Sequence, residues 1–251
     1  MLLTCESALD IDQSLRSHAD TPETVTKLRT ARRDFAYLGY AKIGFLVPPD
    51  VKALVAGDVE RLFEVHGTRR DLRFKETGYT PRRMRNIRRD EVFQDSDLIP
   101  RVYRSEALRD LVASVVGEPV HLCPYEPEQC VITRLESSGD THGWHWDDYS
   151  FALVWVIDCP PVESGGFVQC VPRSTWDKDN PQINRQFVSG PIYSLELAPG
   201  DLYVMRTDTT LHRVYPIQQG QRTIVNMGYA SGADLDKPLT HETMDALWAT
   251  A

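Results

Sequence analysis

Short apolar runs separated by turn residues fill the second half of the chain, and this pattern predicts β-strands. The runs lie at residues 119–123, 129–135, 151–157, 166–171, 193–197, 201–206, 211–215 and 223–230. Segments rich in Gly, Pro, Ser and Asp separate them, for example 137–140 and 198–201. Many short strands at this spacing are typical of a β-sandwich or a β-barrel. No repeat or linker divides the sequence, so we predict a single domain spanning residues 1–251.

The first 117 residues follow a different, mainly helical pattern. Thr21-Pro22-Glu23 offers an N-cap hydroxyl, a proline at the first helical position and an acid in the first turn, which predicts a helix that ends near residue 39. Further helices are expected after 48–50 and between 105 and 117. The remaining expectations are loose structure over the first 20 residues, a strand at 41–47, irregular structure at 67–104 and a closing helix at 241–248.

The composition narrows the class of protein. Of the 251 residues, 41% are hydrophobic and 25% are charged, which is typical of a globular chain with a sizeable core. The net charge of −8 disfavours nucleic acid as a partner. No apolar stretch approaches the roughly 20 residues of a membrane span, and the acidic start of the chain does not resemble a signal peptide. Five cysteines without a close pair indicate reduced thiols, so we expect a cytoplasmic protein.

A candidate metal site stands out against this background. The triplet His145-Trp146-Asp147 comes just before the apolar run at 151–157. Because side chains alternate across a strand, we predict that His145 and Asp147 point to the same face. With His212 they make two histidines and one carboxylate, the facial triad that binds Fe(II) and leaves metal positions open. Zinc accepts the same ligands, and both histidines also suit a purely structural role.

Arg222 follows His212 by ten residues. The turn residues 218–220 predict that the strand carrying His212 folds back on the strand that begins near Arg222, which brings the guanidinium into the metal cavity. A guanidinium binds a carboxylate through two parallel hydrogen bonds, which lysine cannot copy. An acidic co-substrate such as 2-oxoglutarate needs this kind of partner. Arg222 therefore favours iron with an oxoacid over zinc.

Residues 141–149 resemble the iron centre of the BesD-type radical halogenases of free amino acids and their hydroxylase relatives. The resemblance extends over residues 80–86, 167–172, 176–178, 206–213 and 241–248. It implies a β-rich α+β domain whose core is a double-stranded β-helix, the jelly roll of cupins. Residues 118–251 would supply this core and a C-terminal helix, and residues 1–117 the N-terminal helices. It also implies Fe(II), 2-oxoglutarate as co-substrate, and O2.

The sequence departs from these halogenases at the metal itself. They have glycine where this chain has Asp147, and a halide fills the iron position that the missing carboxylate leaves open. Because Asp147 is present, chloride has no evident place on the metal. We therefore expect hydroxylation of a C–H bond rather than chlorination.

The resemblance also suggests which residues bind a free amino acid. Arg82 or Arg83 is expected to bind the α-carboxylate, and His142 and Asp148, which flank the metal triplet, to orient the zwitterion. The same arginine-rich stretch, 82–89, also fits a solvated surface or a nucleic-acid patch, although the acidic net charge disfavours the latter.

Other residues suit the side chain of the substrate. Glu128 is a partner for a cationic side-chain amine, and Trp248 offers that amine an aromatic face worth about 0.5–2 kcal/mol. Asn226, on the strand after Arg222, is a further candidate. A basic amino acid fits these residues best, with lysine first and ornithine second.

Two other functions remain open. The first is a dioxygenase that acts on a carrier-tethered or peptide-bound residue. The second is a non-catalytic cupin that binds metal as a sensor or store. The second alternative needs neither Arg222 nor 2-oxoglutarate. A protein that consumes 2-oxoglutarate is therefore an enzyme and not a metal sensor or store.

Overall fold

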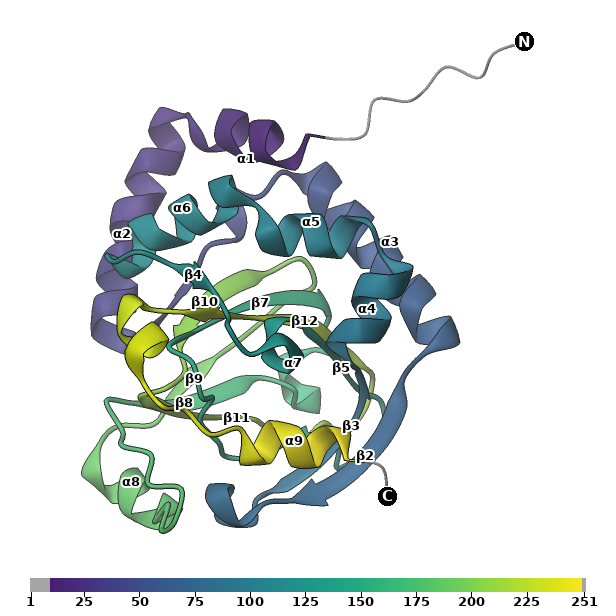
Figure 1. Ribbon diagram of the computed structural model, residues 1–251, viewed down its shortest axis with the longest axis vertical. Helices are drawn as coiled ribbons and strands as arrows, with labels where there is room; N and C mark the ends of the chain where they lie inside the picture. The colour runs from purple at the N-terminus through teal and green to yellow at the C-terminus, as the bar shows by residue number, and fades with distance from the viewer. Residues whose placement is uncertain (1–9, 250–251) are drawn as a thin grey trace.

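Two antiparallel β-sheets packed face to face form the centre of the molecule (Figure 1). The computed structural model describes residues 10–249. The larger sheet runs in the order β1 (Tyr40–Lys42), β10 (Leu202–Arg206), β7 (Phe151–Asp158), β12 (Arg222–Ala230), β5 (Val131–Leu135), β3 (Pro81–Ile87) and β2 (Thr68–Arg73). Two short strands extend it, β4 (His121–Leu122) beside β12 and β6 (Thr141–His142) beside β3. The smaller sheet has the order β11 (Thr210–Val214), β8 (Val168–Pro172) and β9 (Tyr193–Leu195). The predicted jelly-roll core is confirmed.

Strand β7 explains why apolar residues run without interruption through 151–157. Its side chains alternate between two clusters: Phe151 and Leu153 pack under the helices, whereas Ala152 and Val154 pack between the sheets. Both faces are therefore buried, and neither requires a polar position. The second cluster forms part of the wall of the space in which the candidate site lies.

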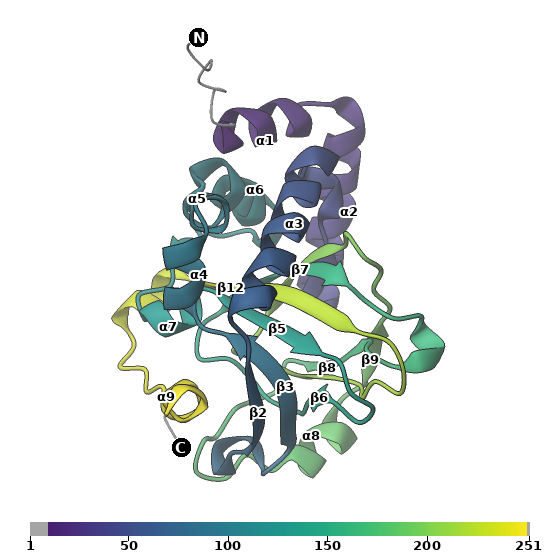
Figure 2. The same ribbon diagram turned by 90° about the vertical axis from the view of Figure 1, so that its right-hand side faces the viewer.

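Helices of the first half cover the outer face of the larger sheet (Figure 2). They are α1 (Ile11–Ala19), α2 (Pro22–Leu38), α3 (Pro49–Val65), α4 (Arg89–Asp95), α5 (Leu98–Arg104) and α6 (Glu106–Val116). The later helices are α7 (Glu126–Gln129), α8 (Ile183–Ser189) and α9 (Glu242–Trp248). Helix α2 begins as predicted, because the Thr21 hydroxyl accepts a hydrogen bond from the amide of Thr24. No helix within residues 10–249 combines the length and hydropathy needed to cross a membrane.

Three predictions for the first half are wrong. Residues 67–104 are not irregular, because they form β2, β3, α4 and α5, and β3 joins the larger sheet beside β5. The first 20 residues are not all loose: α1 forms because Ile11 and Leu15 pack into the core and Asp10 caps the helix. The strand expected at 41–47 is only β1, followed by a 3-10 turn.

The turn at 218–220 does not make a hairpin. Strand β11 pairs with β8 in the smaller sheet, whereas β12 pairs with β7, β5 and β4 in the larger one. The chain therefore crosses between sheets on its way from His212 to Arg222. The predicted fold-back is wrong, yet both side chains line the same cavity because the two sheets face each other.

The cysteines of the described range are reduced. Cys123, Cys130, Cys159 and Cys170 are all free and buried. Burial raises the pKa of these thiols, that of Cys130 to about 12, so they are not poised to ionise. Cys5 lies outside the described residues.

Candidate active site

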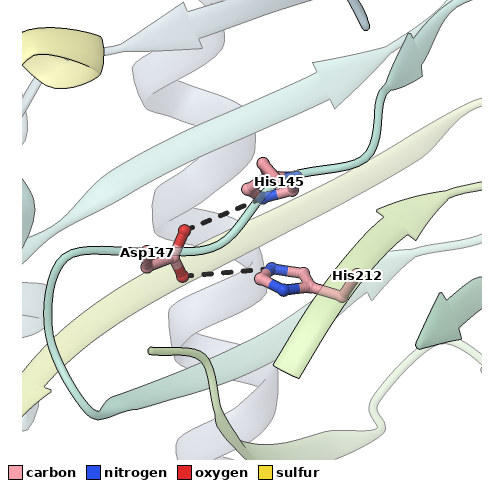
Figure 3. A group of neighbouring side chains, drawn as sticks. All are labelled: His145, Asp147 and His212. Carbon is pink, nitrogen blue, oxygen red and sulfur yellow. Dashed lines mark ion pairs between the residues drawn. The ribbon is translucent and has the colours of Figure 1, made fainter. Parts of the chain in front are cut away.

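The three candidate metal ligands converge between the sheets (Figure 3). Nε2 of His145 lies 3.7 Å from Oδ1 of Asp147, and Nε2 of His212 lies 4.0 Å from Oδ2 of Asp147. One donor atom from each residue lies within 4.8 Å of the others. Two imidazoles and a carboxylate at these separations form the donor set that suits Fe(II).

The triplet does not lie on a regular strand, as the alternation argument assumed. His145 makes an isolated bridge to His212, with two backbone N–H to O hydrogen bonds of 2.9 Å, and Asp147 belongs to the loop that follows. The buried hydroxyl of Ser174 accepts hydrogen bonds from the Trp146 indole (2.8 Å) and the Leu211 amide (2.7 Å). Each donor is the chain neighbour of a metal-ligand candidate. Ser174 therefore fixes both arms of the site, a role the sequence analysis missed.

Both histidines are held in the tautomer that a metal needs. Nδ1 of His145 lies 2.6 Å from the carbonyl of Gly143, and Nδ1 of His212 lies 2.9 Å from the carbonyl of Thr210. A carbonyl only accepts, so each Nδ1 must donate and each Nε2 keeps its lone pair. Burial and the nearby His142 lower the pKa of His145 well below its ordinary value, which keeps it neutral.

Arg222 lies at the start of β12 and is 1% exposed, deep in the same cavity. Among residues 10–249, its Nε and Nη2 have no hydrogen-bond partner. Burial raises the pKa of the adjacent Tyr203 to about 12, so its phenol stays protonated. Buried guanidinium donors without an acceptor are costly, and the carboxylate of an oxoacid would satisfy them. Arg222 therefore fits the predicted co-substrate.

Arg82 and Arg83 point to opposite faces of β3. Arg82 is buried and lines the cavity, and its burial lowers the pKa of the guanidinium to about 10. Arg83 lies on the other face and pairs with Asp71 at 3.5 Å. The strand alternation thus brings Arg82 to the cavity and excludes Arg83 from it.

A second group of ionisable residues lies at the cavity, made by Glu128, Asp148 and His241. Nδ1 of His241 is 3.5 Å from Oε1 of Glu128 and 3.4 Å from Oδ2 of Asp148. The pKa of Glu128 is raised well above its ordinary value by burial and by the charge of Asp148. A cation placed beside these acids would favour the charged form of Glu128 and offset the charge of Asp148. Glu128 lies in the short helix α7, just ahead of β5.

His142 and Asn226 also line the cavity, and each has a polar atom without a hydrogen-bond partner among the described residues. The ring of His142 stacks on that of His145 with centroids 3.6 Å apart, and its Nε2 has no hydrogen-bond partner. Burial lowers the pKa of His142 well below its ordinary value. Oδ1 of Asn226 is also buried and unpaired. Both atoms are available to a zwitterionic ligand.

Trp248 is not brought to the cavity. The guanidinium groups of Arg70 and Arg88 lie 5.7 and 5.3 Å from its ring, and its indole nitrogen donates to the sulfur of Met244 at 3.1 Å. Residues of the same helix, Met244 and Leu247 among them, line the cavity instead. The expected aromatic contact with a substrate amine is therefore corrected: α9 presents its apolar face, and Trp248 anchors the helix to β2 and the segment after β3.

His241 and Lys178 had no role in the sequence analysis. His241 stacks on Tyr125 with ring centroids 3.7 Å apart, and Nζ of Lys178 lies 2.6 Å from Oδ1 of Asp148. Both come from segments remote in sequence from the metal triplet. Only their places in the resembling stretches 176–178 and 241–248 gave any signal.

The comparisons with known proteins agree with this geometry. The model of the family described as Halogenase D matches residues 23–249. The structure is similar to the non-heme α-ketoglutarate-dependent epimerase SnoN from nogalamycin biosynthesis, with a TM-score of 0.64 at 18% identity over 82% of each chain. It is also similar to AviO1 from Streptomyces viridochromogenes Tue57, with a TM-score of 0.62 at 21% identity over 84% of this chain and 97% of that one.

A prolyl-4-hydroxylase from Pseudomonas putida shares the fold at a TM-score of 0.54 and 13% identity, over 81% of this chain and 98% of that one. SnoN has also been solved in complex with Fe3+ and α-ketoglutarate. No curated protein matches the chain. The family match spans most of the sequence and confirms the predicted resemblance. With the fold of the Fe(II)- and 2-oxoglutarate-dependent oxygenases, the chain belongs to the halogenase D family.

Proposed function

We propose that this protein is an Fe(II)- and 2-oxoglutarate-dependent hydroxylase of a free amino acid with a cationic side chain, lysine first and ornithine second. The observation that carries the proposal is the charge pattern of one cavity. It holds a two-histidine, one-carboxylate donor set, two buried arginines at separate places, and a buried acidic pair. A small zwitterion with an additional ammonium matches this pattern.

His145, Asp147 and His212 would hold the iron, and Arg222 would bind the distal carboxylate of 2-oxoglutarate. When bound, iron and oxoacid supply the oxidising chemistry that breaks a C–H bond. The chain's own part is to orient these groups and exclude water. It keeps both Nε2 atoms free for the metal through the carbonyls of Gly143 and Thr210.

At the substrate, opposite charges would fix opposite ends of the amino acid. Arg82 binds the α-carboxylate, assisted by His142, and Glu128 and Asp148 bind ammonium groups. Each of these side chains lines the cavity. Lys178 and His241 already lie beside these acids, but a neutral side chain would add no counter-charge next to Glu128, and a hydrogen bond lost from a buried charged group costs about 1–3 kcal/mol or more. The cavity therefore favours lysine over leucine.

Hydroxylation rather than halogenation follows from Asp147. Its carboxylate is directed at the two imidazoles, so a metal bound there takes an oxygen ligand from the protein. In the halogenases that the sequence resembles, glycine leaves this position to a halide. Membership of the halogenase D family is thus compatible with a different reaction outcome.

The test is succinate formation by the iron-loaded protein with single amino acids, together with mass spectrometry of the products. We expect lysine to stimulate succinate formation most and to gain one oxygen atom. Stimulation only by a carrier-bound or peptide-bound residue would favour the tethered alternative. Metal binding without any 2-oxoglutarate consumption would favour a sensor or storage cupin.

A further inference from the structure

Lys178 joins three segments that are far apart in sequence. Its Nζ lies 2.6 Å from Oδ1 of Asp148 on the metal loop and 2.9 Å from Oε2 of Glu242 at the start of α9. It also donates to the hydroxyl of Thr240 at 3.2 Å and to the carbonyl of the same residue. The ammonium is 4.7 Å from the ring centroid of Trp176, whose indole is fixed by a hydrogen bond to the carbonyl of Glu76.

These contacts sit where the cavity meets the surface. A surface hollow floored by Asp147 and Asp148 is bordered by Lys178 and by residues 237–240. The same two aspartates also line the inner cavity, so they stand between the hollow and the site. One wall of the inner cavity is supplied by Met244 and neighbouring residues of α9. The C-terminal segment is therefore part of the enclosure of the cavity.

Both apolar and polar contacts hold that segment in place. Of the residues of α9, Thr243 and Leu247 are buried, and Leu239 ahead of the helix packs against the cluster of Cys123, Tyr149 and Ala230. Tyr125 donates to Asp245, and Trp248 stands beside two guanidinium groups. Two attachments of the segment end inside the site: the ion pair from Glu242 through Lys178 to Asp148, and the contact of His241 with Asp148 and Glu128. Asp148 is buried, so the Lys178–Asp148 end of the ion pair is screened less by salt than the exposed Glu242 end.

We propose that Lys178 is a positioning residue that pins the C-terminal segment 237–249 to Asp148, beside the direct contact of His241 with the same carboxylate, and so keeps the wall of the amino-acid cavity in place. The inference rests on the proposed function in one respect, that the cavity binds a cationic amino acid. Lys178 acts through Asp148 and α9 rather than by touching the reacting atoms.

We call this positioning role of Lys178 the latch. The latch and the charge of Lys178 taken alone predict opposite changes in the affinity for the substrate lysine when Lys178 is removed. Removing a cation next to Asp148 makes the site more negative, and by charge alone would tighten the binding of lysine. Removing the latch would instead loosen the α9 wall of the cavity and weaken the binding of the substrate lysine. For Lys178→Met we expect an apparent KM for lysine about tenfold higher, with that for 2-oxoglutarate changed less than about twofold. More succinate should form per hydroxylated product, because 2-oxoglutarate is consumed more often without hydroxylation when the amino acid is loosely held.

Hydrogen exchange of the protein without metal or substrate gives a second readout. Amides of residues 237–249 should exchange faster in Lys178→Met, and in the same direction, by less, in Glu242→Gln, which leaves the contact with Asp148 intact. Lys178→Arg should restore most of the protection. Lys75→Met is the matched control, because it removes an exposed ion pair of 3.8 Å to Asp179, the chain neighbour of Lys178. We expect this variant to have the hydrogen exchange and the KM of the wild type.

Unchanged exchange in 237–249, or tighter lysine binding in Lys178→Met, would overturn the latch. If Lys178→Met does not fold, unchanged exchange in Glu242→Gln is sufficient to reject it. Failure of the proposed function is recognised separately, since it appears as a wild-type protein that no cationic amino acid stimulates. The exchange measurement tests the latch even then.

Discussion

The candidate metal centre and the acidic group of Glu128, Asp148 and His241, which we call the amine site after the ammonium proposed to bind there, lie at one cavity but are built in different ways. The candidate metal ligands are positioned mainly by backbone, through a bridge between His145 and His212 and carbonyls that orient each imidazole, with the Ser174 hydroxyl as the side-chain support. The amine site is positioned by side chains, with ion pairs linking Asp148 to His241 and Lys178. Backbone contacts survive substitution of neighbouring side chains, whereas an ion-pair network changes when one member is lost. We therefore expect the metal centre to tolerate substitution of its neighbouring side chains, and the choice of substrate to change readily by substitution in the amine site.

Breaking the metal centre should have the largest effect. His212→Ala leaves two protein ligands, so we expect turnover to vanish and Fe(II) binding to weaken by more than about 100-fold, beyond what loss of a supporting contact costs. Anaerobic iron titration and succinate formation measure both. Because β11 is held by backbone pairing with β8, the unfolding temperature should change little. Full activity of this variant would remove His212 from the metal site.

Asp147 tests whether the same centre decides the reaction outcome. The wild type should give only hydroxylated amino acid, even in high chloride. Asp147→Gly should lose most hydroxylation, by at least about tenfold, since it removes one of three ligands. Mass spectrometry of products in chloride and in chloride-free buffer measures the outcome. A chlorinated amino acid from the unmutated protein would show that the carboxylate does not occupy the position assigned to it.

Arg222 tests the binding of the oxoacid in the same cavity. Arg222→Lys keeps the charge but loses the planar pair of donors. We expect the apparent affinity for 2-oxoglutarate to fall about 10- to 100-fold, the size of one charge-assisted hydrogen bond, while that for the amino acid changes little. Initial rates with each substrate varied in turn give the two constants. If only the amino-acid constant moves, the role of Arg222 is wrong.

Substitution in the amine site should have the smallest effect on turnover. It should change the preference among amino acids rather than the reaction itself. In Glu128→Gln the buried acid becomes neutral, so the preference for lysine over leucine should narrow about tenfold with turnover retained. Glu126→Gln is the control, because Glu126 lies on the same short helix but pairs with Arg89 at 3.3 Å instead of lining the cavity. Equal effects of the two substitutions would contradict a role for Glu128 in selectivity.

The sequence predicted the metal centre better than its surroundings. His145, Asp147 and His212 follow from residue type and spacing, because a metal admits few ligand sets. The geometric reason given for the first two was nevertheless incomplete, since the triplet lies on a loop held by a bridge. The strands near them were predicted from apolar runs, which a sheet buried on both faces requires.

The amine site was harder to predict because its residues converge from remote segments. Lys178 and His241 follow no local period, and their pairing with Asp148 depends on how α9 packs. Trp248 was expected to offer an aromatic face to the substrate amine, and packs against arginines instead. Strand β3 was missed because its arginines hid the alternation that places Arg82 inside and Arg83 outside.

Because the chain crosses between the two sheets, the distance between His212 and Arg222 depends on how far apart the sheets lie. His212 stands on the smaller sheet and Arg222 on the larger one, so the separation of metal and guanidinium is set by the side chains packed between them. This separation would select the oxoacid by its length, and we expect 2-oxoglutarate, with five carbons, to bind better than the four-carbon oxaloacetate. Competition between the two acids measures this selection. Core residues of the cluster between the sheets, such as Val154 and Cys170, would then influence the choice of oxoacid through the spacing of the sheets alone.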